Sequence, residues 1–346
     1  MKAVMLKPEH KLALVDVPKP SLDGPGQILV KVTGAAICGS DVHIKYGDIP
    51  IAPETVIGHE FVGVVAEAAP DVQYFKPGDR VNTAACLWCG CCPACRRGEV
   101  QYCQVGGIWG GGFFKGRPLP GAQTEYVQVF NADMCAVPIP DNVPDEQAIL
   151  VGDVLGTGYH SVVEGGVGPG DTVAVFGCGP VGLAALASLQ LFGPARVFAI
   201  DVLPNRLALA EKFGAEIIDA SKTDAVSEIL GRTDMNGVDV AIEAAGLPVC
   251  FTQALNILRR GGSLSVVGLF PESVQLNLPI LGLSGVRLSM GLGNLGSMRT
   301  LMNLLENGRL DLSSLITHHF PLSEAMEAYD LFENHKNECI KVMLRP

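Results

Sequence analysis

The chain has 346 residues, of which 48% are hydrophobic and 18% are charged. This composition supplies enough apolar material for two domains with buried cores, and too little charge for a disordered chain. The formal net charge of −11 argues against nucleic acid or an anionic membrane as a partner, because both are bound by positively charged surfaces. We therefore expect a globular protein that binds neither nucleic acid nor membrane.

Two segments bear on where the protein resides. Residues 1–8 lack the apolar core and the cleavage site of a signal peptide. Residues 172–195 are uncharged and long enough to span a bilayer, but glycines and a proline divide them into a predicted strand, turn and helix. The sequence therefore predicts a cytoplasmic protein.

The first 150 residues contain short β-type runs separated by glycine and proline. The predicted strands are residues 27–32, 61–67, 80–83 and 124–129. The glycine-rich interval 106–116 is expected to be a flexible loop. This pattern is typical of a mainly β domain.

Possible ligands of one metal ion are dispersed over this region. Cys38 and His59 supply a thiol and an imidazole, and Asp153 could complete the three protein ligands that a catalytic zinc needs. Each of the three also has an ordinary structural interpretation, as a core thiol, a buried histidine and a helix cap. Spacing alone does not decide between these interpretations.

A second possible metal site is local, because six of the eleven cysteines fall between residues 86 and 103. Without a secretory signal, clustered cysteines indicate a metal site rather than disulfides. The spacing C-x2-C-x2-C-x7-C fits the four thiolate ligands of a structural zinc. These would be Cys89, Cys92, Cys95 and Cys103, which we call the four-cysteine lobe. The choice is not unique, because Cys91 is also available and Cys86 begins a run that partly resembles an iron–sulfur pattern.

From about residue 155, strands alternate with longer helical patterns. The predicted strands are residues 172–176, 196–201, 238–243 and 263–268, and the predicted helices are 181–192 and 206–213. This βαβ order predicts a parallel, doubly wound sheet. Towards the C-terminus we expect helices near 296–307 and 323–332 and a final strand.

A dinucleotide-binding fingerprint follows the first of these strands. The strand runs into a G-x-G-x-x-G turn made by Gly177, Gly179 and Gly182, with Pro180 and Val181 inside it. The glycines permit a tight turn, close approach of the backbone to a pyrophosphate, and packing of helix on strand. The diphosphate then lies at the helix N-terminus.

Asp201 ends the next predicted strand, 19 residues after Gly182. A carboxylate at this place accepts hydrogen bonds from the ribose hydroxyls and repels a 2′-phosphate, so Asp201 favours NAD over NADP. Arg206 could assist at the ribose or phosphate, or could be an ordinary exposed helix residue. The alternative to the whole fingerprint is a glycine-rich turn with a surface aspartate.

In this order, the motifs resemble the zinc-containing medium-chain alcohol dehydrogenase family over nearly the whole chain. The resemblance rests on Cys38-Gly39-Ser40-Asp41-x-His43, Gly58-His59-Glu60-x-x-Gly63, the four-cysteine lobe, the glycine-rich turn and Asp201. It implies an α/β fold, with a Rossmann doubly wound sheet domain and a split, mainly β and partly barrel-like catalytic domain. The implied boundaries are 1–153 and 294–346 for the catalytic domain, with its zinc lobe at 86–103, and 154–293 for the NAD-binding domain.

Carried over by motif position, the resemblance implies one catalytic and one structural zinc per chain. The catalytic zinc would be held by Cys38, His59 and Asp153, with aspartate as the third ligand as in the secondary-alcohol and formaldehyde dehydrogenase branch. Glu60 would be a catalytic residue beside the metal, and in some members it moves onto the zinc. The structural zinc would be held by the four-cysteine lobe. Ser40 would pass the alcohol proton towards His43 and solvent. The implied cofactor-binding residues are Thr157, near the nicotinamide, and Gly177, Gly179, Pro180, Val181, Gly182, Asp201 and Arg206.

The activity implied by the resemblance is reversible transfer of a hydride from a primary or secondary alcohol to NAD, which gives an aldehyde or ketone. The implied partner is a small alcohol or carbonyl substrate, and the family favours a homodimer or homotetramer. A polyol, sugar, butanediol or threonine dehydrogenase of the same family is an alternative. An NAD-binding iron–sulfur or redox-sensing protein is the alternative from a different class.

Overall fold

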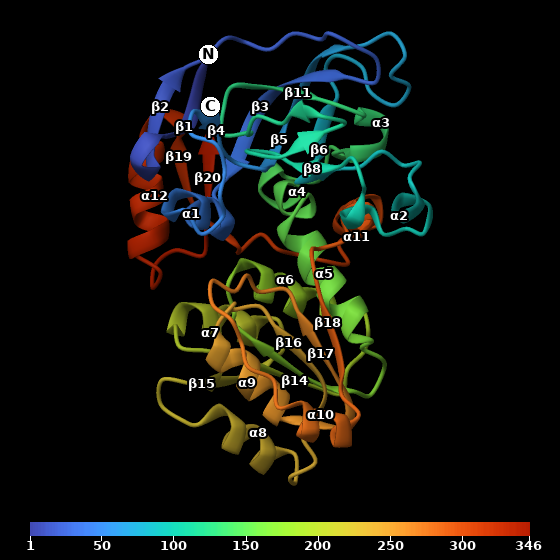
Figure 1. Cartoon of the computed structure of the whole chain (residues 1–346), viewed down its shortest axis with the longest axis vertical. Coiled ribbons are helices and arrows are strands. Elements are labelled where there is room, and N and C mark those ends of the chain that lie inside the picture. The colour runs from blue at the N-terminus through green and yellow to red at the C-terminus, as the bar shows by residue number, and fades with distance from the viewer. The chain divides into compact units, whose positions relative to one another are not determined.

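The computed structural model describes residues 1–346, apart from the side chain of Ile280, as two compact units. Unit 1 comprises Met1–Gly156 and Asn294–Pro346, and unit 2 comprises Thr157–Gly293 (Figure 1). The two ends of the chain therefore belong to one unit, and the segment between them forms the other. The first junction lies within helix α5 (Val154–Gly165).

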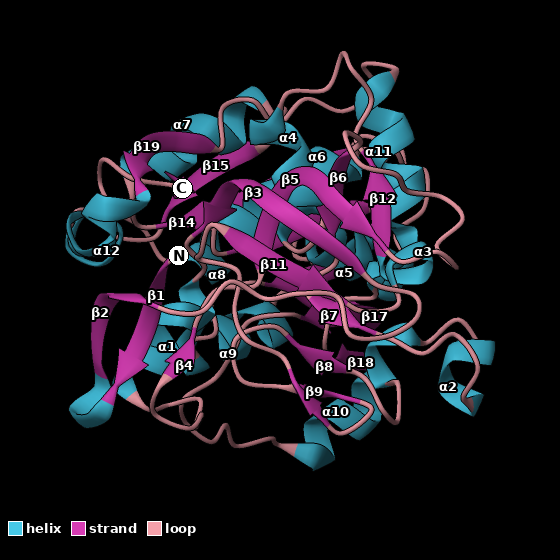
Figure 2. Cartoon of the chain, turned by 90° about the horizontal axis from the view of Figure 1, so that it is seen from above, coloured by secondary structure: helices cyan, strands magenta, loops and turns pink.

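Unit 1 is organised around a seven-stranded sheet in the order β12-β6-β5-β3-β20-β19, with β11 paired to β3. The strands are β3 (Ile28–Ala36), β5 (Glu60–Ala68), β6 (Arg80–Thr83), β11 (Tyr126–Val129), β12 (Ala136–Pro138), β19 (Ile316–Pro321) and β20 (Lys341–Arg345). Figure 2 shows β3, β5 and β6 as neighbouring strands. Since β20 pairs with β3 through Met343↔Ala36 and Leu344↔Ala35, the C-terminal segment completes a sheet begun by the N-terminal segment.

Two helices cover parts of this sheet. Helix α4 (Asp145–Val151) packs across β3, β5 and β6, with its last four residues buried. Helix α12 (Ala325–Asn334) packs on β19 and β20, and contributes Ala328 and Tyr329 to an apolar cluster with Ile37 and Leu344. These contacts fix the ends of β3 and β5, where the candidate site lies.

The remaining elements of unit 1 are short. The strands are β1 (Lys2–Lys7), β2 (Lys11–Asp16), β4 (Thr55–Val56), β7 (Cys86–Leu87), β8 (Gly107–Ile108), β9 (Phe113–Phe114) and β10 (Arg117–Pro118). The helices are α1 (Gly39–Tyr46), α2 (Pro93–Arg96), α3 (Ala132–Cys135), α11 (Met298–Glu306), η1 (Pro8–His10), η2 (Val100–Tyr102), η3 (Leu295–Ser297) and η4 (Leu322–Glu324). The interval 106–116, expected to be a flexible loop, instead contains β8 and β9, which pair with β7 and β10. Its glycines serve close packing, because a Cβ on Gly107 would lie 2.1 Å from the Phe113 carbonyl oxygen.

Unit 2 is a six-stranded parallel sheet in the order β15-β14-β13-β16-β17-β18. The strands are β13 (Thr172–Phe176), β14 (Arg196–Asp201), β15 (Glu216–Asp219), β16 (Val238–Glu243), β17 (Leu258–Val266) and β18 (Arg287–Met290). The helices besides α5 are α6 (Pro180–Leu189), α7 (Pro204–Lys212), α8 (Ala225–Arg232), α9 (Pro248–Asn256) and α10 (Leu278–Ser284). The strand order reverses at β13, as in doubly wound dinucleotide-binding domains, and the predicted fold class is confirmed.

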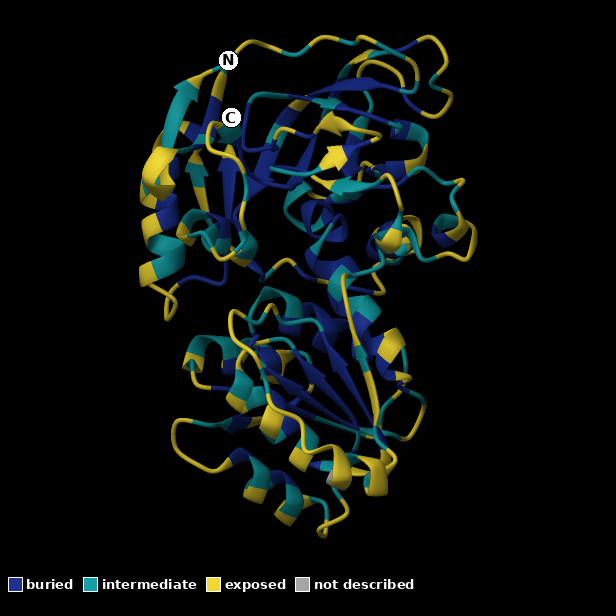
Figure 3. Cartoon of the chain, in the orientation of Figure 1, coloured by how far each residue is buried: buried dark blue, intermediate teal, exposed yellow. Residues whose placement is uncertain are grey.

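Three predicted strands of unit 2 are confirmed with the same bounds, as β13, β14 and β16. Their residues are largely buried (Figure 3), because a parallel sheet covered on both faces needs continuous apolar strands. Phe176 and Phe198 pack there with Ile229 of α8 and Phe251 of α9. The uncharged stretch 172–195 forms β13 and α6, and no helix of the described residues combines the length and apolarity needed to cross a membrane.

Candidate active site and metal centres

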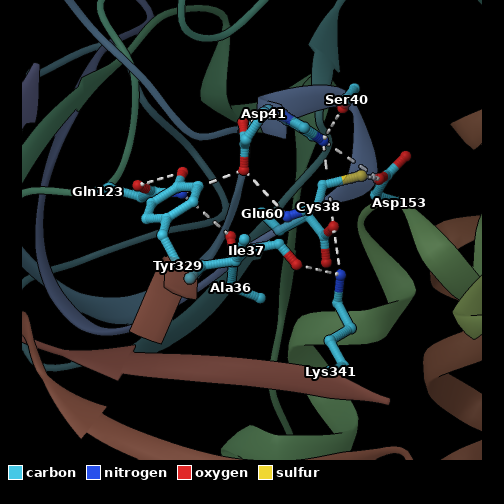
Figure 4. A network of polar contacts seen from close by, with 11 residues as sticks. Ala36, Ile37, Cys38, Ser40, Asp41, Glu60, Gln123, Asp153, Tyr329 and Lys341 are labelled. Atoms are coloured by element: carbon cyan, nitrogen blue, oxygen red, sulfur yellow. Dashed lines mark hydrogen bonds and ion pairs between the residues drawn. The ribbon is translucent and has the colours of Figure 1, made fainter. Parts of the chain in front are cut away.

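Four potential metal ligands from three separate segments of unit 1 converge on one point. They are Cys38, His59, Glu60 and Asp153, and one ligand atom from each lies within 4.8 Å of the others. Figure 4 labels three of them, Cys38, Glu60 and Asp153. Cys38 and Asp153 are 115 positions apart in the chain. The convergence is therefore produced by the fold and not by a local motif.

Adjacent strands and the end of one helix present these side chains. Cys38 follows β3 and is the N-cap residue of α1. His59 and Glu60 lie where the chain enters β5, which pairs with β3 through Glu60↔Ala36. Asp153 follows α4, whose packing on the sheet fixes its position.

The distances within this group fit a zinc ion. Nε2 of His59 lies 3.3 Å from Oδ2 of Asp153, and Sγ of Cys38 lies 3.8 Å from the same oxygen. Zinc bonds of about 2.0–2.3 Å at tetrahedral angles place neighbouring ligand atoms about 3.3–3.8 Å apart. Glu60 is slightly further away, with Oε1 at 4.0 Å from Nε2 of His59. Three ligands of mixed type with one position left open are characteristic of a catalytic zinc site.

The charges around His59 favour a cation at this place. Burial alone would lower the pKa of His59, but the sulfur of Cys38 and the carboxylates of Asp153 and Asp41 raise this pKa well above its ordinary value. Burial would raise the pKa of Asp153, but its hydrogen bond with His59 lowers this pKa. The donors thus form an electronegative site, as a divalent metal ion requires.

Glu60 has its own positive partner. Its Oε1 accepts a hydrogen bond from Nζ of Lys341 at 2.7 Å, and both side chains are almost completely buried. The same Nζ donates to the carbonyl oxygen of Ile37 at 3.1 Å. Burial raises the pKa of Glu60 to about 7, although the Lys341 ammonium opposes this rise. Because Lys341 already balances Glu60, Asp153 is the carboxylate better suited to balance a metal charge.

Asp41 contacts two of the candidate ligands from behind. Its buried Oδ2 accepts a hydrogen bond from the backbone amide of Cys38 at 2.9 Å, which is part of the capping box of α1. Its Oδ1 lies 3.5 Å from Nδ1 of His59. A carboxylate on that nitrogen turns Nε2 towards the other ligands. Asp41 is not among the predicted site residues, although an acidic residue three positions after an N-cap is a recognisable capping signal.

The predicted proton-relay residues both belong to α1. Oγ of Ser40 lies 3.5 Å from Nε2 of His59, beside the ligand group. His43 is about one turn further along, is one-third exposed, and has its Nδ1 2.8 Å from Oδ2 of Asp48. Among the described side chains no hydrogen bond joins Ser40 to His43. A relay between them needs a bridging hydroxyl or water.

The four-cysteine lobe forms a second group whose ligand atoms lie within 4.8 Å, made of Cys89, Cys92, Cys95 and Cys103. Sγ of Cys92 lies 3.5 Å from that of Cys95 and 4.0 Å from that of Cys103, and the Cys89 and Cys95 sulfurs are 4.0 Å apart. Zinc–sulfur bonds of about 2.3 Å at tetrahedral angles give a separation of about 3.8 Å. The four thiols therefore fit one zinc ion with no open position, as in a structural site.

Backbone amides donate hydrogen bonds to Sγ of Cys89 and favour its thiolate form. The amides of Cys91 and Cys92 donate to Sγ of Cys89 at 3.5 and 3.3 Å. Burial would raise the pKa of Cys89, but these donors lower it to about 6, and the thiolate is the form that binds zinc. Cys86 lies instead in β7, where burial raises its pKa to about 12. Cys86 and the exposed Cys91 do not belong to the ligand group that the described residues form.

In unit 2 the glycine-rich turn joins β13 to α6. Gly177 has a φ of 88°, and a Cβ on Gly182 would lie 1.8 Å from the carbonyl oxygen of Gly177. Both positions therefore require glycine. A Cβ on Gly179 would meet only Nη1 of Arg206, at 3.9 Å. The backbone at Gly179 is thus open to close approach by a ligand, as the fingerprint predicts.

The other predicted cofactor contacts lie on helices. Pro180 and Val181 begin α6, with Gly179 as its N-cap, and a helix N-terminus attracts anions such as diphosphate. Thr157 lies in α5, and its Oγ1 is only 2.4 Å from the position that a Cβ on Gly293 would take. The role of Thr157 near a nicotinamide stays a prediction.

Asp201 ends β14 and closes the glycine-rich turn. Its Oδ2 accepts a hydrogen bond from the backbone amide of Cys178 at 2.7 Å, and its Oδ1 accepts from the amides of Val202 and Leu203. Nη1 of Arg206 lies 3.8 Å from Oδ2. Each carboxylate oxygen has more than one lone pair, so ribose hydroxyls can still bind. The structure thus gives Asp201 a structural contact that the sequence analysis did not anticipate.

Glu243, which the sequence analysis also missed, lies on the other side of β13. It ends β16, where it pairs with Phe176, and its Oε1 accepts hydrogen bonds from the amides of Ala245 and Gly246 at 3.0 and 2.9 Å. Burial raises the pKa of Glu243 to about 7, although these amides oppose the rise. Only the strand order brings this carboxyl group beside the glycine-rich turn, so no local pattern could reveal it.

Two groups of zinc-type ligands together with a doubly wound sheet and its glycine-rich turn define the class of zinc-dependent dehydrogenases. Two family models match the chain: "Alcohol dehydrogenase GroES-like domain" at residues 24–141 and "Zinc-binding dehydrogenase" at residues 180–307. The alcohol dehydrogenase of Cupriavidus necator is 35% identical over 367 residues, covering 100% of this chain and 99% of that protein. The sorbitol dehydrogenase of Bacillus subtilis is 32% identical (100% and 97% covered), and the L-threonine 3-dehydrogenase of Pyrococcus furiosus is 33% identical (100% and 99% covered).

Three solved structures that resemble this chain are also alcohol dehydrogenases or zinc-binding dehydrogenases. Alcohol dehydrogenase TADH from Thermus sp. ATN1 has a TM-score of 0.93 and 37% identity, with 100% of this chain and 99% of that chain covered. The zinc dependent alcohol dehydrogenase 2 from Streptococcus pneumoniae has a TM-score of 0.91 and 35% identity (100% and 98% covered). A zinc-binding dehydrogenase from Sinorhizobium meliloti 1021 bound to NADP has a TM-score of 0.89 and 30% identity (100% and 99% covered). The chain belongs to the zinc-containing medium-chain alcohol dehydrogenase family, and the predicted resemblance is confirmed.

Proposed function

We propose that the chain is an NAD-dependent zinc alcohol dehydrogenase, which moves a hydride from a primary or secondary alcohol to NAD and releases one proton. The observation that carries this proposal is the convergence of Cys38, His59 and Asp153 on one point of unit 1, with Glu60 beside them. Relatives named as alcohol dehydrogenases support the reaction class. The reaction is reversible, so an aldehyde or ketone is the substrate in the opposite direction.

In this proposal the two ligand groups have different tasks. Cys38, His59 and Asp153 hold a catalytic zinc, and the four-cysteine lobe holds a structural zinc. A catalytic zinc acts as a Lewis acid that polarises an alcohol hydroxyl and lowers its pKa. The structural zinc joins short elements that could not bury a core of their own.

The side chains of α1 would carry the proton away. Ser40 places its hydroxyl beside the ligand group, 3.5 Å from Nε2 of His59. A serine is a poor base, so it acts as a relay rather than as the final acceptor. His43 is suited to exchange the proton with solvent, because it is partly exposed and its Nδ1 is held by Asp48. Nε2 of His43 is then the nitrogen that gains and loses the proton.

NAD is the proposed cofactor because Asp201 would accept the ribose hydroxyls and repel a 2′-phosphate. The structure of the relative from Sinorhizobium meliloti is bound to NADP, so both cofactors occur among similar proteins. Initial rates at equal concentrations should favour NAD by at least about tenfold, because placing like charges together costs several kcal/mol. Asp201→Asn keeps an oxygen that accepts from the turn and removes the charge, so the ratio of the initial rate with NAD to that with NADP should fall. A wild-type preference for NADP would refute the role of Asp201.

Metal analysis of Cys38→Ser tests the metal site. The wild type is expected to contain two zinc ions per chain, and the variant one, with turnover lost and NAD binding retained. Cys91→Ser is the matched control, because this exposed thiol lies outside both ligand groups and should leave both ions and turnover unchanged. Two zinc ions and normal turnover in Cys38→Ser would contradict the proposal. A brown protein containing iron would instead favour an iron–sulfur protein.

The substrate within the alcohol class is a separate question. Similar proteins include a sorbitol dehydrogenase, an L-threonine 3-dehydrogenase and a butanediol dehydrogenase. A panel of ethanol, 2-propanol, 2,3-butanediol, sorbitol and threonine separates simple alcohols from polyols and amino alcohols. We expect the highest kcat/KM with a simple primary or secondary alcohol, and a clear preference for sorbitol or threonine would replace that expectation.

A homodimer or homotetramer is also proposed. Strand β18 is the last strand of the unit 2 sheet and exposes Leu288 and Met290, and Leu283 of α10 is highly exposed. An edge strand with apolar side chains offers a pairing surface to another copy. Light scattering should show a dimer or larger assembly, and Met290→Lys should shift it towards the monomer. A monomeric wild type would refute this part.

A further inference from the structure

Gln123 and Tyr329 form a buried polar pair behind the candidate metal site, and neither takes part in the proposed reaction. The hydroxyl of Tyr329, on α12, donates to Oε1 of Gln123 at 3.0 Å. Nε2 of Gln123 donates to Oδ2 of Asp41 at 3.1 Å. In Figure 4, dashed lines mark these contacts, which form a row of hydrogen bonds from Tyr329 through Gln123 to Asp41. The row connects the C-terminal helix to the carboxylate that contacts Cys38 and His59.

The groups in the row fix one another's orientation. An amide side chain has an accepting end and a donating end. The amino end of Gln123 faces two oxygens that can only accept, Oδ2 of Asp41 and the carbonyl oxygen of Ala36 at 3.5 Å, so Oε1 is left to accept from the Tyr329 hydroxyl. A reversed amide would place its oxygen against the Asp41 carboxylate. The acceptors Asp41 and Ala36 thus set the orientation of the amide, and the Tyr329 hydroxyl stabilises it by donating to Oε1.

Asp41 transmits this orientation to the ligands. Its Oδ2 accepts hydrogen bonds from Nε2 of Gln123 and from the backbone amide of Cys38, so two donors hold the carboxylate at one oxygen. Its Oδ1 then faces Nδ1 of His59 at 3.5 Å, and has no hydrogen-bond partner among the described residues. A carboxylate released by Gln123 could rotate away from the His59 ring.

The backbone beside His59 is shaped to admit Gln123, which is an independent observation. Gly58 has a φ of 94°, and a Cβ on it would lie 2.4 Å from Cγ of Gln123. The amide of Gln123 donates to the carbonyl oxygen of Ile57 at 3.0 Å, and that of Ala122 donates to Gly58 at 2.8 Å. The segment that carries His59 is thus tied to Gln123 through its backbone and has space only for a glycine next to it.

From these contacts we infer that Gln123 and Tyr329 are positioning residues of the catalytic metal site. They hold the Asp41 carboxylate so that it fixes the Cys38 backbone and the His59 ring for metal binding. The inference rests on the proposed function in requiring a zinc at Cys38, His59 and Asp153. Removing a group that orients a metal ligand weakens metal affinity by about 10- to 100-fold.

The test measures how fast each zinc leaves the full-length protein for a colour-forming chelator. Zinc release is expected in two phases, one for each ion. Cys38→Ser should keep only the zinc of the four-cysteine lobe, so the phase that remains in this variant belongs to that ion. Tyr329→Phe removes the hydroxyl and keeps the ring, and should accelerate release of the catalytic zinc by roughly 3- to 10-fold, because it acts two contacts away from His59. Gln123→Met removes both polar ends and should accelerate it by about tenfold or more. Ser188→Ala, which removes a buried hydroxyl of unit 2, should change neither phase.

The four-cysteine zinc serves as an internal standard for folding. Faster release of the catalytic zinc alone supports the inference, as does a shift of the d–d absorption bands of a cobalt-substituted site in Gln123→Met. Unchanged release of both ions in the two variants overturns it. Equal acceleration of both phases also overturns it, because that pattern indicates general loosening. A wild type with one zinc per chain would overturn the proposed function as well, so the two failures are distinguishable.

Discussion

Glu243 is a buried carboxyl group whose ionisation should be measurable in the stability of the protein. Its Oε1 accepts two backbone amides, whereas Oε2 has no hydrogen-bond partner among the described residues and lies 2.4 Å from the position of a Cβ on Gly268. Burial raises its pKa from 4.5 to about 7. Glu243→Gln keeps the shape and the accepting oxygen and removes the charge. The substitution therefore isolates the free-energy cost of ionising this group.

The direction and magnitude of the change in the free energy of unfolding follow from the pKa of Glu243 in the folded and in the unfolded state. The folded state keeps the proton up to about pH 7, whereas the unfolded chain loses it near pH 4.5. Between these values the folded state binds more protons, so the free energy of unfolding falls as the pH rises. Each pKa unit corresponds to about 1.4 kcal/mol, so the complete loss is about 3 kcal/mol above pH 7. Below about pH 4.5 the Glu243 carboxyl group keeps its proton in both states, so its ionisation no longer changes the free energy of unfolding.

The assay compares the free energy of unfolding of wild type and Glu243→Gln by denaturant at several pH values and equal zinc content. Relative to the wild type, the variant should gain up to about 3 kcal/mol between about pH 5 and pH 8. Glu216→Gln is the control, because Arg196 holds the pKa of Glu216 below its ordinary value and its contribution changes only in more acidic solution. A difference between wild type and Glu243→Gln that does not vary with pH would refute the reasoning.

Three further substitutions test unit 1. Cys103→Ser removes one of the four proposed ligands of the structural zinc and should lower the zinc content and the thermal midpoint together, whereas a normal zinc content would exclude Cys103 as a ligand. Lys341→Met leaves the buried Glu60 carboxylate without its partner, and should cost about 3–5 kcal/mol in unfolding experiments, part of which the added change Glu60→Gln restores; no loss would contradict the buried pair. Gly58→Ala should destabilise more than Gly78→Ala in thermal melts, because both have similar positive φ values but only Gly58 has a neighbour within 4 Å. Equal losses would refute the close contact with Gln123.

The dinucleotide-binding half was predictable from local patterns. A parallel sheet buried on both faces requires continuous apolar runs, and the runs in this sequence predict the bounds of β13, β14 and β16. Helices α8 and α9 were not predicted. Both are short, and a short helix gains most of its stability from tertiary packing, here of Ile229 and Phe251 on the sheet.

The candidate site was predictable as a set of residue types but not as an arrangement. Cys38 and His59 stand in short motifs, whereas Asp153 reaches them only because α4 packs on β3 and β5. Lys341 and Tyr329 come from the C-terminal segment and have no local signal at all. Their positions depend on the pairing of β20 with β3 and the docking of α12, which are long-range properties of the chain.

The C-terminal segment also explains how a site with two carboxylates can suit a divalent ion. In the proposed site, a Cys38 thiolate and the Asp153 carboxylate would together balance the two charges of zinc. An ionised Glu60 at the same place would make the ligand set anionic and weaken zinc as a Lewis acid. Lys341 cancels that charge through its 2.7 Å contact with Glu60. A buried ammonium is costly unless it is paired, so β20, which joins the C-terminal segment to the sheet, also supplies the charge that would keep the proposed metal site neutral.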